Sequence, residues 1–428
     1  MAENPSRHGR IFGRLRSIGA FYEVLILAAI LWFLGKFIRY AFPPLFETLQ
    51  EEYTVSTSEI GFAFSAFMVL YALLQFPSGV LADRFGASRV ITGGAMVAAL
   101  GGLLILIRPP FLLLVVAMAV IGAGTGAHKT VAVRLLSNVY PSRFGRTLGI
   151  FDTIGASGGV AAPLVVAGIL GLAVLNWQLL FAMTAVAFLS AGFWFLHRTA
   201  RSRVTQQTTA NTGSVLQWDI YRDTFSSWKL MGFIGVTVLI AFAYNGLVAF
   251  LPLMLVIEGG LTPAVASLLY SVLFIASVTQ LVTGEATDRF GPLPTAAVCV
   301  VCATAGLIGL VWMLTVGTDF DTSRGLMLLG GAVLAIGIGA HGYRPARDVY
   351  IVSLVPQATT GGSLGVVRTL LMMAGAVSPG LVGFIADQFT FLVAFTGLAL
   401  IAMAALLLIV VLAMSEFTRR LEPIEKHT

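Results

Sequence analysis

The chain has 428 residues, of which 57% are hydrophobic and only 11% are Asp, Glu, Lys or Arg. A soluble domain carries about 25% charged residues, so this composition excludes a soluble enzyme and a disordered chain. The net charge of +6 comes from basic residues too sparse to form a phosphate-tracking surface, which excludes nucleic acid as a partner.

Apolar runs long enough to cross a lipid bilayer recur along the whole chain. A membrane-spanning helix needs about 20 mostly apolar residues. A basic stretch precedes the first run, but no small-residue cleavage site follows it, so we expect no removed signal peptide. The sequence predicts twelve spans, at residues 21–42, 58–82, 88–107, 110–138, 146–173, 176–197, 228–256, 262–287, 292–316, 325–354, 362–386 and 389–414.

One long polar segment divides these spans into two sets of six. Within and beside it, four aromatic residues at near-helical spacing predict a short helix on the membrane surface: Trp218, Tyr221, Phe225 and Trp228. The alternative is that the segment is a tether between the two sets. The fold class expected is an all-α membrane protein built from two six-helix bundles. Its predicted parts are an N-terminal tail (1–20), a first bundle (21–197), a linker (198–227), a second bundle (228–414) and a C-terminal tail (415–428).

The distribution of basic residues predicts the orientation. Most of the 26 Lys and Arg residues fall in the two tails, the linker and the loops on one side of the predicted spans. The other side holds Arg108 and Arg324 beside a collection of acidic residues. Because cytoplasmic loops carry an excess of Lys and Arg, we expect both termini in the cytoplasm and a multi-pass protein of the cell membrane.

The two halves of the chain repeat each other. The segment GVLADRFG at Gly79–Gly86 returns as GEATDRFG at Gly284–Gly291. The segments GAGTGAHKTVAVRLLSNVYP and GIGAHGYRPARDVYIVSLVP have equal length and end at Pro141 and Pro356. A simple topology anchor would account for one copy of the first segment, but not for two copies at matched places.

The stretch GVLADRFGASRV resembles the signature loop of the major facilitator superfamily, and the resemblance extends over residues 20–415. It implies two pseudo-symmetric bundles around a central cavity that opens to one side at a time. Asp83 can cap or pair at a helix end, and Gly86 permits a tight turn. The resemblance implies a conformational latch formed by Gly79, Asp83, Arg84, Gly86, Arg89, Gly284, Asp288, Arg289 and Gly291.

Within that family, RYAFPPL and SEIGFAFSAFMVLYALLQFPSGVLADRFG are most similar to the organic-anion and organophosphate branches. Proton-coupled drug exporters of the family often carry an Arg early in the fourth span, where this chain has Met118. Their GPxxGG signature is replaced by GASGGVAAP. Both departures disfavour a drug/proton antiporter.

Seven basic residues fall inside predicted spans: Lys36, Arg39, Lys129, Arg134, Arg344, Arg347 and Arg368. Each costs about 2.5–3.5 kcal/mol at a lipid-facing helix centre, so each must line water, pair with an acid or snorkel. Depth along neighbouring spans predicts the pairs Arg134–Asp152 and Asp348–Arg368. These pairs serve either as structural or gating contacts or as part of coupling.

Lys129 and Arg344 each lie twelve residues before the matched proline of their half, near mid-membrane. In the family resembled, spans one, four, seven and ten line the cavity, so these two cations are the main candidates to bind an anion. Lys36 and Arg39 share a helix face, and Arg347 follows Arg344 by one turn. The alternative for these three is that the first two snorkel outward and Arg347 pairs with Asp348.

Four further residues are weaker candidates. Tyr244 and Asn245 either hydrogen-bond a substrate or pack between helices. His128 and His341 either titrate during a proton-coupled cycle or fill space as hydrogen-bonded residues. The sequence contains no phosphate-binding loop, nucleophile triad or metal cluster, so we expect no enzymatic chemistry, no cofactor and no metal.

These features predict a secondary active transporter for a small anion such as a carboxylate, sulfonate or phosphate ester. We expect a monomer whose partners are the bilayer, the substrate and a coupling proton, sodium ion or counter-anion. One alternative is a proton-coupled exporter of drugs or neutral solutes. The other is a sensor or scaffold that keeps the transporter fold without transport.

Overall fold

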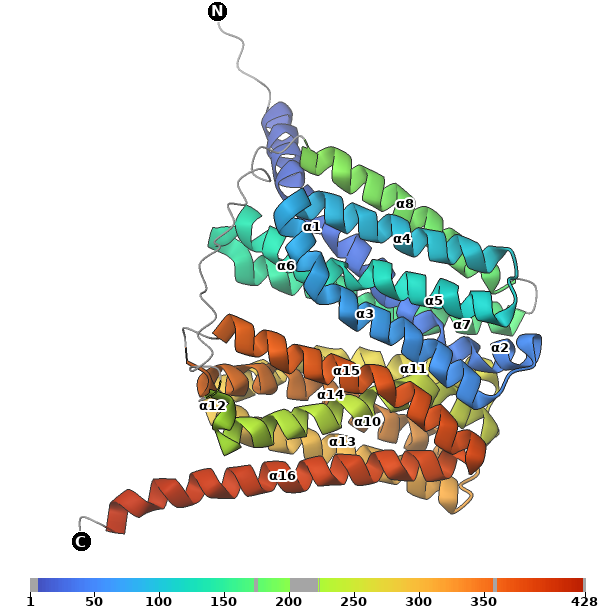
Figure 1. Ribbon diagram of the computed structural model, residues 1–428, viewed down its shortest axis with the longest axis vertical. Helices are drawn as coiled ribbons and strands as arrows, with labels where there is room; N and C mark the ends of the chain where they lie inside the picture. Colours follow the sequence, from blue (N-terminus) through green and yellow to red (C-terminus); the bar gives the residue numbers. More distant parts are fainter. Residues whose placement is uncertain (1–6, 173–175, 201–221, 223, 357–359, 426–428) are drawn as a thin grey trace, which may run out of the picture. The chain divides into compact units, whose positions relative to one another are not determined.

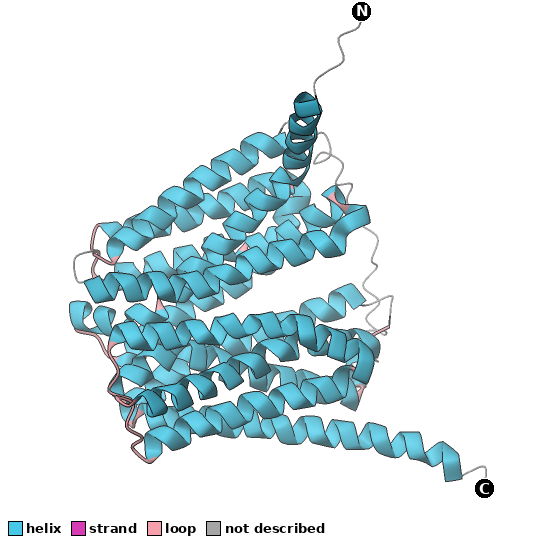
Figure 2. Ribbon diagram, turned by 180° about the vertical axis from the view of Figure 1, so that it is seen from behind, coloured by secondary structure: helices cyan, strands magenta, loops and turns pink. Residues whose placement is uncertain are grey.

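The computed structural model describes residues 7–172, 176–200, 222, 224–356 and 360–425. Throughout these residues the regular structure is helical, and Figure 2 shows no strand in them. Within the described chain, twelve helical segments are long and apolar enough to cross a membrane. The predicted all-α membrane fold is therefore confirmed. The surface helix predicted around Trp218 and Tyr221 falls largely outside the described residues.

The helices follow the predicted spans closely. The first half contains α1 (Arg7–Ala41), α2 (Phe46–Tyr53), α3 (Thr57–Phe85), α4 (Ala87–Leu106), α5 (Phe111–Gly126), α6 (His128–Val139), α7 (Phe144–Leu172) and α8 (Gln178–Ala200). The second half contains α10 (Trp228–Ile257), α11 (Pro263–Ile275), α12 (Thr279–Phe290), α13 (Pro292–Thr315), α14 (Ser323–Leu354), α15 (Thr360–Gln388) and α16 (Phe391–Glu425). The fourth span is interrupted between α5 and α6, and the eighth between α11 and α12.

The repeated loop turns on a glycine in both halves. Gly86 separates α3 from α4 with a φ of +86°, and Gly291 separates α12 from α13 with a φ of +91°. A residue with a Cβ rarely adopts such positive φ values. The prediction that Gly86 permits a tight turn is therefore confirmed, and its repeat partner does the same.

The chain forms two compact units, which are described separately. Unit 1 comprises residues 1–39, 73–159 and 178–211, and unit 2 comprises 40–72, 160–177 and 212–428. The domain boundary predicted at 198–227 stays a prediction, because most of that segment lies outside the described residues.

Small residues bring the helices of unit 1 close together. Helix α4 packs against both α5 and α8 (Figure 1). A Cβ added at Gly94 would lie 2.6 Å from the carbonyl oxygen of Gly124, and one added at Gly102 would lie 3.0 Å from that of Phe181. Such contacts let helix backbones pack directly in a membrane, where no hydrophobic force draws helices together.

In unit 2, α10 packs against α15 and α16, while α13 packs against α14 and α16. The core of these helices includes Phe233, whose ring lies 4.5 Å from that of Tyr350. The Tyr343 hydroxyl lies 3.0 Å from that of Thr237. The Cys302 thiol of α13 donates to the carbonyl oxygen of Ala335 on α14 at 3.4 Å.

The part of α3 that belongs to unit 2 lies directly against α15. A Cβ at Gly61 would come within 2.7 Å of the Pro379 carbonyl oxygen. The Gly380 amide donates to the Ser65 hydroxyl at 2.8 Å. The Ser58 hydroxyl donates to the Asp387 carboxylate at 2.8 Å. We call this contact the α3–α15 seam.

Aromatic contacts continue from the seam to α10 and α11 within the same unit. The ring of Phe46 lies 5.5 Å from that of Phe250 on α10. The ring of Tyr40 lies 4.3 Å from that of Phe274 on α11. The segment that follows the first span is thereby bound to the second half of the chain.

Candidate functional site

Two lysines of unit 1 lie over one tryptophan ring. Lys36 follows Trp32 by four residues on α1, and its Nζ lies 5.2 Å from the centroid of the indole. Lys129, at the start of α6, places its Nζ 5.3 Å from the same ring. Cations at this distance are attracted to the negative face of an aromatic ring. Two of the predicted anion-binding residues are thus brought together at what we call the Trp32 site, formed by Trp32, Lys36, Lys129 and Asp152.

The indole at this site is held firmly in place. Trp32 is only 3% exposed, and its ring stacks on Phe151 of α7 with centroids 6.2 Å apart. A Cβ at Gly155 would clash with the indole, and one at Gly158 would clash with the carbonyl oxygen of Phe33. The missing side chains of Gly155 and Gly158 therefore let α1 lie directly against α7 and fix the ring beneath both lysines.

Asp152 supplies the acidic partner of Lys129. Its Oδ1 lies 3.0 Å from the Lys129 Nζ, so the predicted Arg134–Asp152 pair is wrong. Arg134 instead pairs with Asp83. Lys129 and Arg134 are five residues apart, which separates them by about 140° around a helix. Lys129 therefore points toward α7 and Arg134 toward α3, although both lie at depths compatible with Asp152.

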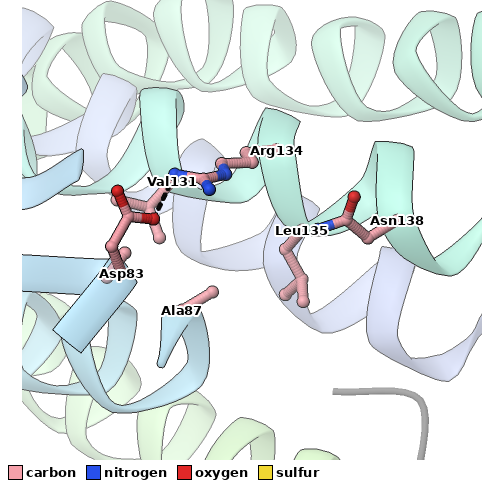
Figure 3. A pocket seen from close by; sticks show the side chains of 7 residues that line it. Asp83, Ala87, Val131, Arg134, Leu135 and Asn138 are labelled. Atoms are coloured by element: carbon pink, nitrogen blue, oxygen red, sulfur yellow. Dashed lines mark ion pairs between the residues drawn. The ribbon is translucent and has the colours of Figure 1, made fainter. Parts of the chain in front are cut away.

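The Asp83–Arg134 ion pair joins the end of α3 to α6 (Figure 3). The two residues line a hollow together with Ala82, Ala87, Val131, Leu135 and Asn138. Of the two roles expected for Asp83, the structure shows pairing. In the repeated loop, Asp288 makes no ion pair with a described residue. Val349 stands seven residues before Pro356, the place that Arg134 has relative to Pro141, so the second half lacks the basic partner.

Replacing Asp83 with Asn should lower stability by about 0.5–1 kcal/mol, because both partners are partly exposed and the pair is screened by solvent. A double-mutant cycle of Asp83→Asn and Arg134→Gln, followed by thermal unfolding in detergent, should give a coupling energy of similar size. Asp288→Asn is the matched control and should leave stability nearly unchanged. Equal effects at the two aspartates would contradict the assignment.

In unit 2, Tyr244 brings two predicted residues together. Its hydroxyl lies 3.2 Å from the His341 Nε2. The guanidinium carbon of Arg344 lies 5.6 Å from the centroid of the Tyr244 ring. We call Tyr244, His341 and Arg344 the Tyr244 cluster. It joins α10 to α14 and offers a hydroxyl, an imidazole and a guanidinium to a polar solute.

Neighbouring predicted residues have other contacts. Arg347 pairs with Asp348, with Nε and Nη2 each 2.8 Å from Oδ1. This was the alternative expected for Arg347, and it replaces the predicted Asp348–Arg368 pair, which is wrong. Asn245 donates to the carbonyl oxygen of Ala241 at 2.8 Å and packs against Gly375, which favours the packing role.

Two further predicted site residues, His128 and Arg39, are buried in unit 1. His128 is buried and hydrogen-bonded to the backbone of Ala28, so it ties α6 to α1 as a space-filling residue does. Arg39 is only 9% exposed, so the alternative in which it snorkels outward is wrong. Lys36 does not extend away from the helices either, because it lies over Trp32.

The sequence reasoning missed Trp32 and the true partners of Asp152 and Asp83. The four-residue spacing of Trp32 and Lys36 on one helix was a usable signal, because residues at this spacing are neighbours on the helix surface. The pair Gly155 and Gly158 was another, since small residues three positions apart indicate close helix packing.

The apolar helices and the sequence repeat define a multi-pass membrane protein of two related halves. A model of the Major Facilitator Superfamily matches residues 25–342 and 260–427. The chain belongs to this superfamily, whose members are transporters, so the expectation that it is not an enzyme is confirmed. The resemblance to organic-anion branches is also confirmed by its relatives.

Three relatives are informative. The hexuronate transporter of Bacillus subtilis (strain 168) is 25% identical over 79% of this chain and 82% of its own length. A probable sulfoacetate transporter of Cupriavidus necator is 29% identical over 38% of this chain and 40% of its own. The 2-nitroimidazole transporter of Escherichia coli (strain K12) is 25% identical over 80% of this chain and 85% of its own.

Solved structures support the fold. The nucleoside transporter NupG superimposes with a TM-score of 0.76 at 14% identity, covering 92% of this chain and 99% of that one. Similarity at this level of identity concerns the fold alone.

Proposed function

We propose that this protein is a secondary active transporter of a small organic anion that carries a carboxylate, sulfonate or phosphate ester. The observation that carries the proposal is the Trp32 site, where two lysines are held over one buried ring inside apolar helices. Basic groups kept at such a cost in membrane spans are most often functional. The relatives named for hexuronate and sulfoacetate support an anionic substrate.

In this proposal Lys129 and Lys36 bind the anion in the first half, and Arg344 with Tyr244 binds it in the second. The secondary binding residues are Arg39, Arg347 and Asn245.

The residues that take part in coupling or gating are Asp152, Arg134, Asp348, Arg368, His128 and His341. The loop residues around Asp83 and Asp288 form the conformational latch. The protein acts as a monomer in the plasma membrane with both termini in the cytoplasm, coupled to a proton, sodium ion or counter-anion.

A thermal-shift screen of the purified protein tests the substrate class. The panel contains galacturonate, sulfoacetate, a sugar phosphate, neutral galactose and 2-nitroimidazole. A bound ligand at 100 times its dissociation constant stabilises the folded state by about 2.7 kcal/mol. We expect stabilisation by at least one anion and none by galactose. The stabilising anion should then show saturable uptake into proteoliposomes.

A second candidate is an exporter of drugs or neutral solutes. The relative named for 2-nitroimidazole favours it, because it matches a share of this chain similar to that of the hexuronate transporter. In the same screen this candidate predicts stabilisation by 2-nitroimidazole and by none of the anions. That result would overturn the anion proposal.

A further inference from the structure

The carboxylate of Asp152 already occupies the position beside Lys129 where the proposed anion would bind. The Asp152 Oδ1 lies 3.0 Å from the Lys129 Nζ, which in turn lies over the Trp32 ring that also carries Lys36. Charge-assisted contacts between an ammonium and a carboxylate have this length whether the carboxylate belongs to the protein or to a solute. The Trp32 site therefore already accommodates a carboxylate.

The ion pair between Lys129 and Asp152 is partly exposed, so another anion can reach Lys129. The side chains of Lys129 and Asp152 are 26% and 44% exposed, so neither is sealed within the helix packing. A partly exposed ion pair contributes little to stability because solvent screens it. Little free energy is therefore lost when an incoming carboxylate replaces Asp152 as the partner of Lys129. The buried ring of Trp32 keeps its position during this exchange.

We propose that Asp152 is an internal counter-anion that competes with the substrate for Lys129, and that the substrate group bound here is a carboxylate. The proposal rests on the proposed function and narrows its three anion classes to one. A planar carboxylate reproduces the contact that Asp152 makes. The competition keeps Lys129 neutralised when no substrate is bound and weakens substrate binding, so that the substrate can leave.

The direction in which Asp152→Asn changes galacturonate binding distinguishes a competing carboxylate from one that only supports the fold. In Asp152→Asn the side chain keeps its size but no longer competes for Lys129. Binding of galacturonate, measured by calorimetry on the purified protein, should tighten about fivefold, which corresponds to about 1 kcal/mol. Saturable uptake in proteoliposomes should show a lower KM and a lower kcat, because release becomes slower. A residue that only supports the fold would weaken binding when replaced.

Two further variants complete the test. Asp152→Glu keeps a competing carboxylate and should bind galacturonate about as the wild-type protein does. Asp321→Asn removes an exposed carboxylate from the loop before α14 and should change nothing. If Asp152→Asn fails to fold, the double variant Lys129→Gln/Asp152→Asn leaves no unbalanced charge. It should bind galacturonate more tightly than Lys129→Gln alone, because Asp152 no longer repels the ligand.

The role of Asp152, the carboxylate assignment and the proposed function are each overturned by a different result. Unchanged or weaker galacturonate binding in Asp152→Asn, with binding still dependent on Lys129, overturns the role of Asp152 and leaves the proposed function standing. Binding of the sugar phosphate without binding of galacturonate or sulfoacetate, both of which carry a carboxylate, overturns the carboxylate assignment alone. Binding of no anion by the wild-type protein or by Asp152→Asn overturns both proposals.

Discussion

Replacing Lys129 with glutamine is expected to weaken anion binding strongly and to lower anion uptake at any given substrate concentration. The substitution removes the ammonium that lies over Trp32 and leaves Asp152 without the partner it has at 3.0 Å. A hydrogen bond to a charged group contributes about 1.5–3 kcal/mol, and the remaining carboxylate repels the substrate in addition. The dissociation constant for the transported anion should therefore rise by about a hundredfold.

The measurement is uptake into proteoliposomes, with equilibrium binding on the same preparations. Arg344→Gln tests the Tyr244 cluster in the same way and should also weaken binding, since its guanidinium lies over the Tyr244 ring. Arg324→Gln removes an exposed positive charge at the start of α14 and serves as the control. Undiminished uptake in both Lys129→Gln and Arg344→Gln would refute the assignment of the binding residues.

Gly155→Ala should produce the largest loss of stability among conservative substitutions in α7. The added methyl group would clash with the indole of Trp32, which is 3% exposed and stacked on Phe151. Overpacking of a well-packed core costs about 1–3 kcal/mol. Because the ring also carries Lys36 and Lys129, the substitution should displace both lysines and weaken anion binding as well.

Thermal unfolding in detergent measures the effect on stability. Gly149→Ala lies in the same helix and its added Cβ meets open space, so it should be neutral or stabilise by about 0.5–1 kcal/mol. Combining Gly155→Ala with Trp32→Leu should recover part of the lost stability, because the smaller side chain frees the volume that the methyl group needs. Equal unfolding temperatures for the two alanine variants would contradict this packing argument.

The sequence predicted most of the fold because spans, turns and repeats depend on local properties. Apolar run length located the twelve spans, and the repeated DRFG located two turns that require glycine. The depth of Lys129 within its span was also predictable from the rise of a helix. The direction in which Lys129 points was not, because it depends on how α6 is rotated after the interruption at Ala127.

The partners in the ion pairs could not be predicted from the sequence either. Arg134 and Lys129 lie at similar depths, so depth alone favoured the wrong partner for Asp152. The pair Asp83–Arg134 connects positions far apart in sequence, and the repeat gave no help because Val349 replaces the arginine in the second half. Trp32 was overlooked because an aromatic residue in a membrane helix is ordinarily packing material, and its second lysine comes from another helix.

The α3–α15 seam bears on how quickly such a protein turns over. Gly61 and Gly380 let the backbones of α3 and α15 approach closely beside the rings of Phe250 and Phe62. Water can replace the hydrogen bonds of Ser65 and Ser58. We therefore expect the polar contacts of the seam to separate at low cost. We expect the withdrawal of the neighbouring aromatic rings from α10 and α11 to be the slower part of any such separation.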